Sequence, residues 1–253
     1  MSALLLGLSY SWWMAKHNSQ HANPNKEDAD PDVHSTVLVL TPGATIRRKG
    51  FPTEISRFQG WFFLPLLCFE GLNLQVASLK TLLFTSGVRH RIVELLMIIA
   101  RHSALAVFLL AYLPPGKALA FLGVQLVVFG VMLGGAFALN HIGMPTVPMG
   151  VHLDFLRRQV LMSRNISDGP LIRFLMGGLQ YQIEHHLFPI IPRPQLPETQ
   201  GLVRQRCKEL SIRYTENSLS EALFHVISYL NQVRLRTQDR YACPLVQRYR
   251  GCR

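Results

Sequence analysis

Three short stretches of the chain carry side chains that could do chemistry, and the last of them is the most informative. Within residues 180–189, Gln182, His185 and His186 are spaced so that a helix would turn all three toward one face. Buried imidazole and amide groups each need a polar partner, since leaving one unpaired costs free energy. A metal ion supplies such a partner, and imidazole nitrogen suits iron, zinc or copper. The spacing therefore predicts a metal site on this helix.

The other two stretches lie before and after a long apolar region. His17 and His21 are spaced i, i+4 and so share a helix face, just before an Asn-Pro-Asn turn at residues 23–25 stops that helix. His141 follows Asn140 at the end of a long apolar segment. Taken alone, His141 is more typical of an imidazole at a helix end than of a metal ligand.

Together these stretches resemble the membrane fatty-acid desaturases. The string Gln-Ile-Glu-His-His-Leu-Phe-Pro at residues 182–189 is typical of the front-end type, in which Gln replaces His at the start of the last histidine box. The Trp-Trp pair at residues 12–13 and the segments 163–166 and 176–178 also look like that family. The chain looks most like the bacterial acyl-lipid or acyl-CoA desaturases of this type, over about residues 6–229.

The resemblance implies an enzyme that introduces a cis double bond into an acyl chain with O₂ and two histidine-bound iron ions. Removing two hydrogens from an unactivated acyl chain is beyond side-chain acids and bases, whereas an oxidant made from O₂ at iron can do it. Asn140 and Gln182 are secondary candidates as ligands, because an amide binds a metal through its oxygen or holds a bound water. Glu184 points away from the His185 face and is expected to orient an imidazole. The implied iron ligands are His17, His21, His141, His185 and His186.

The chain departs from the family pattern in two places. The family carries a first His-x-x-x-His box well upstream of the second, and only sixteen residues precede His17 here. We therefore expect this chain to lack the first box. The second box of the family ends in two adjacent histidines, and Gln20 stands where the first of that pair belongs. An amide oxygen binds iron less well than imidazole, so Gln20 is expected to leave one iron short of a ligand.

The composition favours an all-α integral membrane protein. Apolar residues make up 49% of the 253 residues, and the mean hydropathy is +0.18. Residues 118–139 are a charge-free run that spans about 33 Å at a rise of about 1.5 Å per residue, enough to cross a hydrocarbon core. Residues 92–113 are also apolar apart from Arg101 and His102, and a Pro-Pro-Gly turn at 114–116 joins the two runs. The two runs predict one transmembrane hairpin.

A third apolar run, at residues 61–79, is less suited to the bilayer core. Pro65, Glu70 and Asn73 interrupt it, so it is interpreted as an interfacial or partly inserted helix. Two crossings then return the chain to the face it left, and the histidine boxes share one helical cap. Basic residues at 46–49 and after Asp154 make that face cytoplasmic by the positive-inside rule.

This organisation predicts one fatty-acid desaturase domain followed by a tail. The domain covers residues 1–235, with its membrane hairpin at about 92–139 and its cytoplasmic part at about 140–235. Residues 236–253 have the composition of a loose basic tail.

The net charge of +11 points to an anionic partner. Lipid headgroups attract basic residues near a membrane surface by about 1 kcal/mol each. An acidic electron carrier or the phosphates of a CoA thioester are the alternatives. Nucleic acid is not an expected partner, because no binding motif accompanies the charge. The sequence has no His-Pro-Gly-Gly haem motif, so electrons are expected from a separate donor such as a ferredoxin or a cytochrome.

Three functions remain open at this point. The last histidine box favours a desaturase acting on a fatty acyl substrate, either an acyl-lipid or an acyl-CoA. The absent first box and Gln20 favour a non-catalytic membrane remnant of a desaturase for this chain on its own. A related lipid hydroxylase or ketolase is the third alternative, and the Gln-Ile-Glu-His-His string disfavours it.

Overall fold

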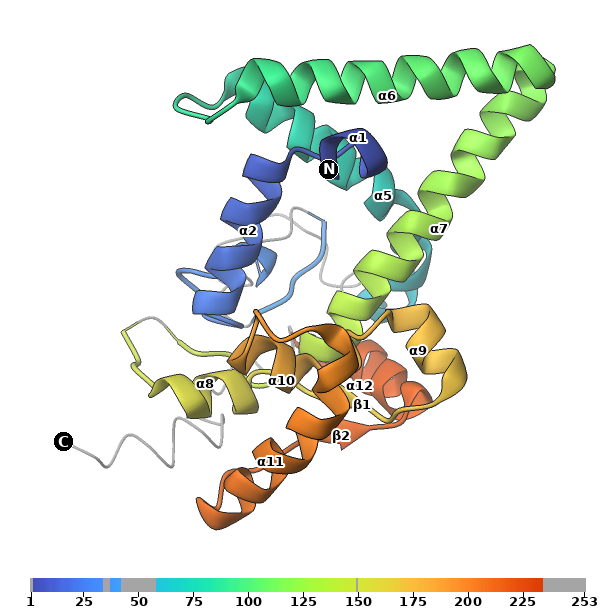
Figure 1. Ribbon diagram of the computed structural model, residues 1–253. Coiled ribbons are helices and arrows are strands. Elements are labelled where there is room, and N and C mark those ends of the chain that lie inside the picture. The colour runs from blue at the N-terminus through green and yellow to red at the C-terminus, as the bar shows by residue number, and fades with distance from the viewer. Residues whose placement is uncertain (1, 34–36, 42–57, 149, 234–253) are drawn as a thin grey trace. The chain divides into compact units, whose positions relative to one another are not determined.

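The computed structural model describes residues 2–33, 37–41, 58–148 and 150–233, and these residues are mostly helical (Figure 1). Within them the strands are only two residues long each, which confirms the all-α prediction. The predicted basic tail at 236–253 and the basic cluster at 46–49 lie outside the described residues. The helices are α1 (Ser2–Leu6), α2 (Tyr10–Ala22), α5 (Gln59–Phe84), α6 (Arg91–Tyr112), α7 (Pro115–His141), α8 (Phe155–Leu161), α9 (Pro170–Met176), α10 (Gln182–Leu187), α11 (Leu196–Glu209) and α12 (Leu219–Gln232).

Three helices, α5, α6 and α7, are long and apolar enough to cross a membrane. The predicted hairpin corresponds to α6 and α7, which begin and end within a few residues of the expected positions. The run interpreted as an interfacial helix belongs to α5, which is 26 residues long and also has the length and composition of a span. Its polar groups pair with each other, since the Asn73 amide donates to the Glu70 carboxylate at 3.1 Å. This pairing lowers the cost of placing both side chains on an apolar helix.

The chain divides into two compact units, and α2, α5 and α7 each contribute to both. The first unit contains Met1–Asn18 and Pro65–Gly135, and the second contains Ser19–Leu64 and Ala136–Arg253.

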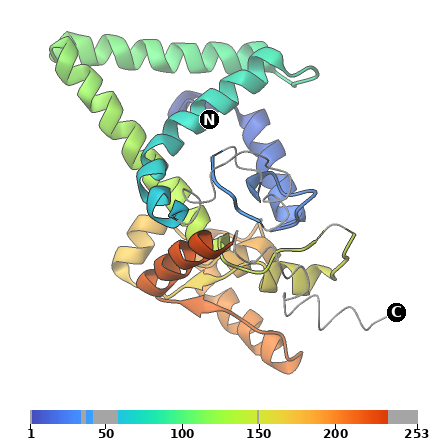
Figure 2. The same ribbon diagram turned by 180° about the vertical axis from the view of Figure 1, so that it is seen from behind.

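In the first unit, α5 and α7 cross with their backbones in direct contact (Figure 2). A Cβ atom added at Gly71 would lie 2.3 Å from the carbonyl oxygen of Leu126. One added at Gly130 would lie 2.5 Å from the carbonyl oxygen of Leu67. Small residues of this kind let two apolar helices approach closely, which is how helices associate within a bilayer.

The same unit fixes the start of α2. Two serines, Ser9 and Ser11, donate their hydroxyls to the carboxylate of Glu94 on α6, and Ser11 does so at 2.6 Å. The amide of Trp12 donates to the Ser9 hydroxyl at 3.1 Å, which caps the first turn of α2. These bonds satisfy a buried carboxylate and anchor the helix that carries His17 and His21.

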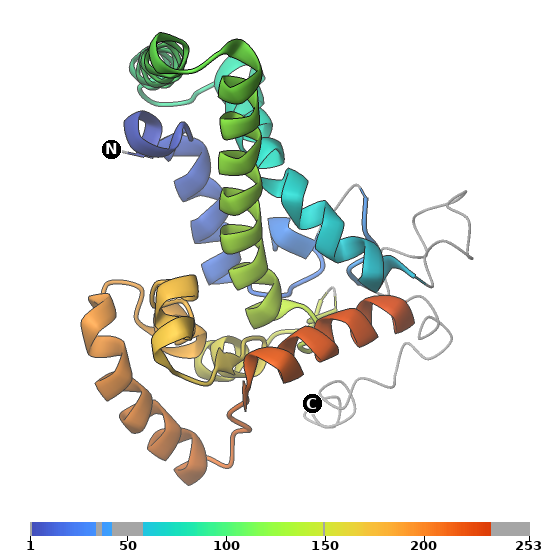
Figure 3. The same cartoon turned by 90° about the vertical axis from the view of Figure 1, so that its right-hand side faces the viewer.

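In the second unit, a buried core supports one side of α10. Ile183 and Leu187 of α10 pack with Val160 of α8 and with Val203 and Cys207 of α11. Strands β1 (Asn165–Ile166) and β2 (Glu216–Asn217) pair in parallel nearby, and β2 joins α11 to α12 (Figure 3). The short helix α10 is therefore held by tertiary packing, which a six-residue helix requires.

Candidate metal centre

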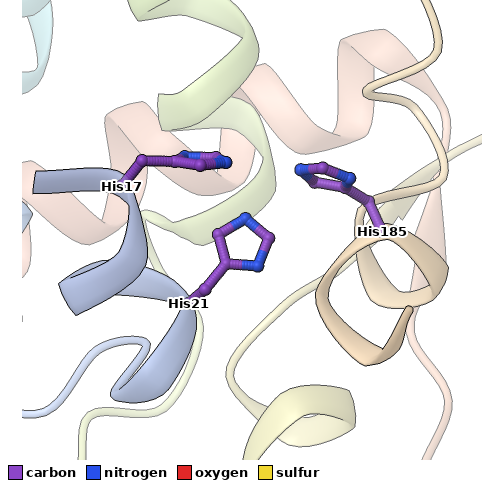
Figure 4. A group of neighbouring side chains, drawn as sticks. All are labelled: His17, His21 and His185. Atoms are coloured by element: carbon purple, nitrogen blue, oxygen red, sulfur yellow. The ribbon is translucent and has the colours of Figure 1, made fainter. Parts of the chain in front are cut away.

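The end of α2 carries the first two histidines. His17 and His21 are one turn apart on this helix and face the same side, as the spacing predicts (Figure 4). One ring nitrogen of His17 lies within 4.8 Å of one ring nitrogen of His21. Trp13, one turn earlier, stacks on the His17 ring at a centroid distance of 5.5 Å. The helix ends at Ala22, directly before the Asn-Pro-Asn turn, which confirms the predicted boundary.

Asn25, the last residue of that turn, fastens it to the segments around His141. Its buried side-chain amide donates to the carbonyl oxygens of His141 at 3.1 Å, Pro145 at 3.2 Å and Met162 at 3.2 Å. Its backbone is in the left-handed region, with φ of 54°, which asparagine tolerates better than most residues. The sequence had shown Asn25 only as part of a helix stop.

The end of α7 carries Asn140 and His141, and a buried arginine holds it. The guanidinium of Arg164 donates to the carbonyl oxygens of Leu139 and Ile142, and the Arg164 amide donates to the Asn140 carbonyl at 3.0 Å. A cation at a helix C-terminus satisfies carbonyls that the helix leaves unpaired. Burial lowers the pKa of Arg164 to about 10, so it remains charged at neutral pH.

The short helix α10 brings His185 and His186 to His21. The His185 ring meets the His21 ring edge to face, at a centroid distance of 4.7 Å (Figure 4). One ring nitrogen of His185 also lies within 4.8 Å of one ring nitrogen of His21. His186 stacks on His21 with an interplanar angle of 8° and a centroid distance of 4.2 Å.

The tautomers of His141 and His186 follow from what their Nδ1 atoms contact. Nδ1 of His141 lies 3.3 Å from the carbonyl oxygen of Met162, which only accepts, so this nitrogen carries the hydrogen. Nδ1 of His186 lies 3.1 Å from Oε1 of Gln159, whose amide nitrogen donates at 2.9 Å to the carbonyl of His21. Both Nε2 atoms therefore carry a lone pair. A carbonyl or amide partner at Nδ1 is the usual way in which proteins orient an imidazole ligand.

Two amide side chains, those of Gln20 and Gln182, contact these lone pairs, and the amide of Asn140 contacts Gln182. Nε2 of Gln20 lies 3.0 Å from Nε2 of His141 and 3.4 Å from Nε2 of His186. Nε2 of Gln182 lies 3.0 Å from the same His141 nitrogen, and Oε1 of Gln182 accepts from Asn140 at 3.0 Å. The side chains of Gln20, Asn140 and Gln182 are all buried.

Glu184 has a different role from the one expected. The Asn165 amide donates to its carboxylate at 2.6 Å, and the Tyr214 hydroxyl donates to it at 2.8 Å. Oδ1 of Asn165 accepts from the amide of Ile183 at 2.9 Å. Burial raises the pKa of Glu184, and burial followed by the charge of Glu184 raises that of Tyr214. The prediction that Glu184 orients an imidazole is wrong, because its partners hold the opposite side of α10.

The second unit thus gathers most of the predicted ligands: His21, His141, His185, His186, Asn140 and Gln182. His17 lies one turn from His21 on the shared helix. Two buried amide oxygens, Oε1 of Gln20 and Oδ1 of Asn140, have no hydrogen-bond partner among the described residues. Uncharged imidazole lone pairs and amide oxygens suit a borderline transition-metal ion such as iron or zinc. The residues around His21 and His185 fit a metal ion, whereas the amide of Gln20 lies between His141 and His186.

Three helices with the length and composition of membrane spans, together with a group of neighbouring histidines, are typical of integral membrane proteins that have a histidine-lined metal site. Comparison with known proteins then specifies the family. The fatty acid desaturase family model matches residues 1–218, and the chain belongs to this family.

Curated relatives show the same family. The chain is 32% identical to an acyl-lipid (9-3)-desaturase of Borago officinalis over 93% of its length and 55% of the relative. It is 31% identical to the Delta(6)-fatty-acid desaturase fat-3 of Caenorhabditis elegans, over 83% of the chain and 50% of the relative. It is 28% identical to a Delta 8-(E)-sphingolipid desaturase of Kluyveromyces lactis, over 94% of the chain and 45% of the relative. The chain spans about half the length of these relatives. No solved structure matches it significantly.

Proposed function

We propose that the chain acts in O₂-dependent desaturation of a fatty acyl chain at a histidine-bound iron centre. The observation that carries this proposal is the convergence of the His21, His141, His185 and His186 rings from α2, α7 and α10. The printed names of the relatives, which describe acyl-lipid, fatty-acid and sphingolipid desaturases, support an acyl or lipid substrate. Their names and the Gln182-initiated box support the front-end type of reaction, on the carboxyl side of an existing double bond.

The chain's own residues hold and orient the centre. His17, His21, His141, His185 and His186 are the proposed iron ligands, with Asn140 and Gln182 as amide contributors. The family resemblance implies two iron ions, which would supply the oxidant that side chains lack. Gln159 and the Met162 carbonyl fix the hydrogen of His186 and His141 on Nδ1, so that Nε2 of each ring carries the lone pair. Burial of Asn140, His141, Gln182 and His186 would keep bulk water away from the acyl carbon atoms to be oxidised.

We also propose a cytoplasmic site and a separate electron donor. Two crossings by the predicted hairpin of α6 and α7, with α5 not completing a crossing, return the chain to the face it left, so α2 and α10 lie on one face. The excess of arginine after Asp154 favours the cytoplasm for that face. A ferredoxin or a cytochrome would deliver the electrons, and the acyl group would arrive as membrane lipid or as acyl-CoA.

Expression of the chain in yeast supplied with an unsaturated fatty acid tests this function. The lipids are converted to methyl esters, and mass spectrometry locates any new double bond. A new double bond between the existing one and the carboxyl end is expected, and the His185→Phe variant should form none. A hydroxylated acyl product would replace desaturase by hydroxylase. Unchanged lipids from a folded, membrane-inserted chain would make the chain a non-catalytic relative.

A further inference from the structure

We propose that the chain's own residues bind one metal ion, at His21 and His185, with His17 one turn from His21 on α2. In this proposal the Gln20 side chain occupies the place that a second ion would take. In this arrangement the Gln20 amide hydrogen-bonds to the two imidazoles, His141 and His186, that would otherwise take another ion. The inference rests on the proposed function for the kind of metal ion, and it limits the ion that this chain binds by itself to the histidines around His21 and His185.

The position of the Gln20 amide is the first step. A carboxamide nitrogen has two hydrogens, and Nε2 of Gln20 lies within hydrogen-bond distance of two imidazole lone pairs, at 3.0 Å and 3.4 Å. An imidazole binds a metal ion such as zinc at about 2.0–2.1 Å. An ion shared by His141 and His186 would therefore need the space that the amide group occupies.

The tautomers determine which end of the amide faces the histidines. Nδ1 of His141 and Nδ1 of His186 donate to oxygen acceptors, so both Nε2 atoms are acceptors. A Gln20 side chain turned the other way would put its oxygen against two lone pairs, which repel it. The nitrogen therefore faces the imidazoles, and the Gln20 oxygen is left without a partner among the described residues.

The amides of Gln182 and Asn140 extend the hydrogen bonding around His141. Gln182 donates to the same His141 nitrogen at 3.0 Å, and Asn140 donates to Gln182 at 3.0 Å. His141 thus receives two amide donors on one lone pair. The side chains of Gln20 and His186 are each 2% exposed, so no water competes readily for these bonds.

The Gln20 amide contacts the ring nitrogens of His141 and His186, whereas the ring nitrogens of His21 and His185 lie close to each other. Their nitrogens lie within 4.8 Å of each other, close enough for small side-chain rotations to bring both to one ion. His17 adds a third imidazole from the preceding turn of α2, within the same distance of His21 (Figure 4). His21 and His185 thus offer two imidazoles to one transition-metal ion, and His17 lies one turn from His21 on α2.

The test counts metal ions in the intact 253-residue chain, purified in mild detergent and loaded anaerobically with Co²⁺. Elemental analysis gives the number of ions, and the visible absorption of Co²⁺ reports its nitrogen ligands. We expect one tightly bound ion per chain. His185→Phe should lose it, whereas the adjacent His186→Phe should keep it, because a phenyl ring preserves stacking on His21 without a nitrogen ligand.

Substitution of Gln20 completes the test. Gln20→His exchanges the amide for a third imidazole beside His141 and His186 and should raise the count from one toward two. Gln20→Leu adds no ligand and should leave it at one. Circular dichroism and size exclusion confirm that each variant is folded before its metal is counted.

Two tightly bound ions in the wild type, or loss of the ion from folded His186→Phe, would overturn the inference and leave the proposed desaturase function standing. A wild-type chain without bound metal would overturn it as well. The proposed function fails separately, if a chain with bound iron leaves the acyl lipids unchanged.

Discussion

The side-chain oxygen of Gln159 accepts a hydrogen bond from Nδ1 of His186 at 3.1 Å. The amide nitrogen of the same side chain donates to the backbone carbonyl of His21 at 2.9 Å. One side chain therefore orients an imidazole and satisfies a carbonyl in the last turn of α2. Gln159 lies on α8 and belongs to none of the histidine boxes. A residue outside the motif thus sets which nitrogen of a proposed ligand carries the hydrogen.

We expect Gln159→Leu to lower the free energy of unfolding by about 1–3 kcal/mol, because it leaves a buried imidazole N–H and a backbone carbonyl unpaired. Denaturant unfolding in detergent, followed by circular dichroism, measures the change. Gln205→Leu is the matched control, since Gln205 is exposed on α11 and its loss should change stability by less than about 0.5 kcal/mol. Equal stability of the two variants would contradict the role of Gln159.

Arg164 gives a second prediction, because it is buried and donates to two carbonyls at the end of α7. Arg164→Met should lower the free energy of unfolding by about 2 kcal/mol or more, since both carbonyls lose a charged donor. Arg164→Lys should retain part of the stability, because an ammonium cannot span both carbonyls as the planar guanidinium does. The exposed Arg213→Met is the control, and chemical denaturation compares all three variants. Wild-type stability in Arg164→Met would show that this cap is dispensable.

Local patterns in the sequence predict the helices and much of the histidine set. The i, i+4 spacing of His17 and His21, followed by Asn-Pro-Asn, gives both the face and the end of α2. The charge-free run at 118–139 gives α7 within three residues at each end. These features are predictable because helix periodicity and turn residues act over a few positions.

The anchoring residues depend on long-range contacts that no local pattern encodes. Asn25 and Arg164 donate to backbone carbonyls at the end of α7. Every residue has a backbone carbonyl, so the residue types in the sequence do not show which carbonyl a side chain will bind. Gln20 was identified from the sequence as a missing ligand, but its hydrogen bonds to His141 and His186 appear only in the fold. The role of Glu184 was mistaken because helix geometry gives the side it faces and not its partners there.

Asp168 should make stability depend on pH in the acid range. The hydrogen bond from the Arg173 guanidinium holds the pKa of Asp168 well below its usual range. A carboxyl group with a lowered folded-state pKa stabilises the fold above its unfolded pKa of about 3.9, and this contribution is lost as pH falls toward the folded value. Asp168→Asn should therefore unfold at a lower temperature than the wild type at pH 5–7, and the difference should shrink below about pH 4.

Thermal unfolding at a series of pH values measures this effect. Because Arg173 is exposed, the difference in midpoint temperature should be small. Arg173→Met removes the donor and should reproduce the Asp168→Asn profile. A constant difference from pH 7 to pH 3 would show that the ion pair does not cause it.

The crossing of α5 and α7 gives the last prediction, which concerns backbone contact alone. Alanine is normally more favourable than glycine inside a helix, by about 0.5–1 kcal/mol. At Gly71 and Gly130, however, a new Cβ would lie 2.3 Å and 2.5 Å from backbone atoms of the facing helix, so the helices must separate. Gly71→Ala and Gly130→Ala should each lose about 1–3 kcal/mol of stability.

Gly123 on α7 provides the matched control, because a Cβ added there would meet no other part of the described chain within 4 Å. Gly123→Ala should be as stable as the wild type or gain up to about 1 kcal/mol from helix propensity. Unfolding of the three variants in mixed micelles with increasing SDS measures the differences. If Gly71→Ala and Gly130→Ala matched Gly123→Ala, α5 and α7 could not be in direct backbone contact at these glycines.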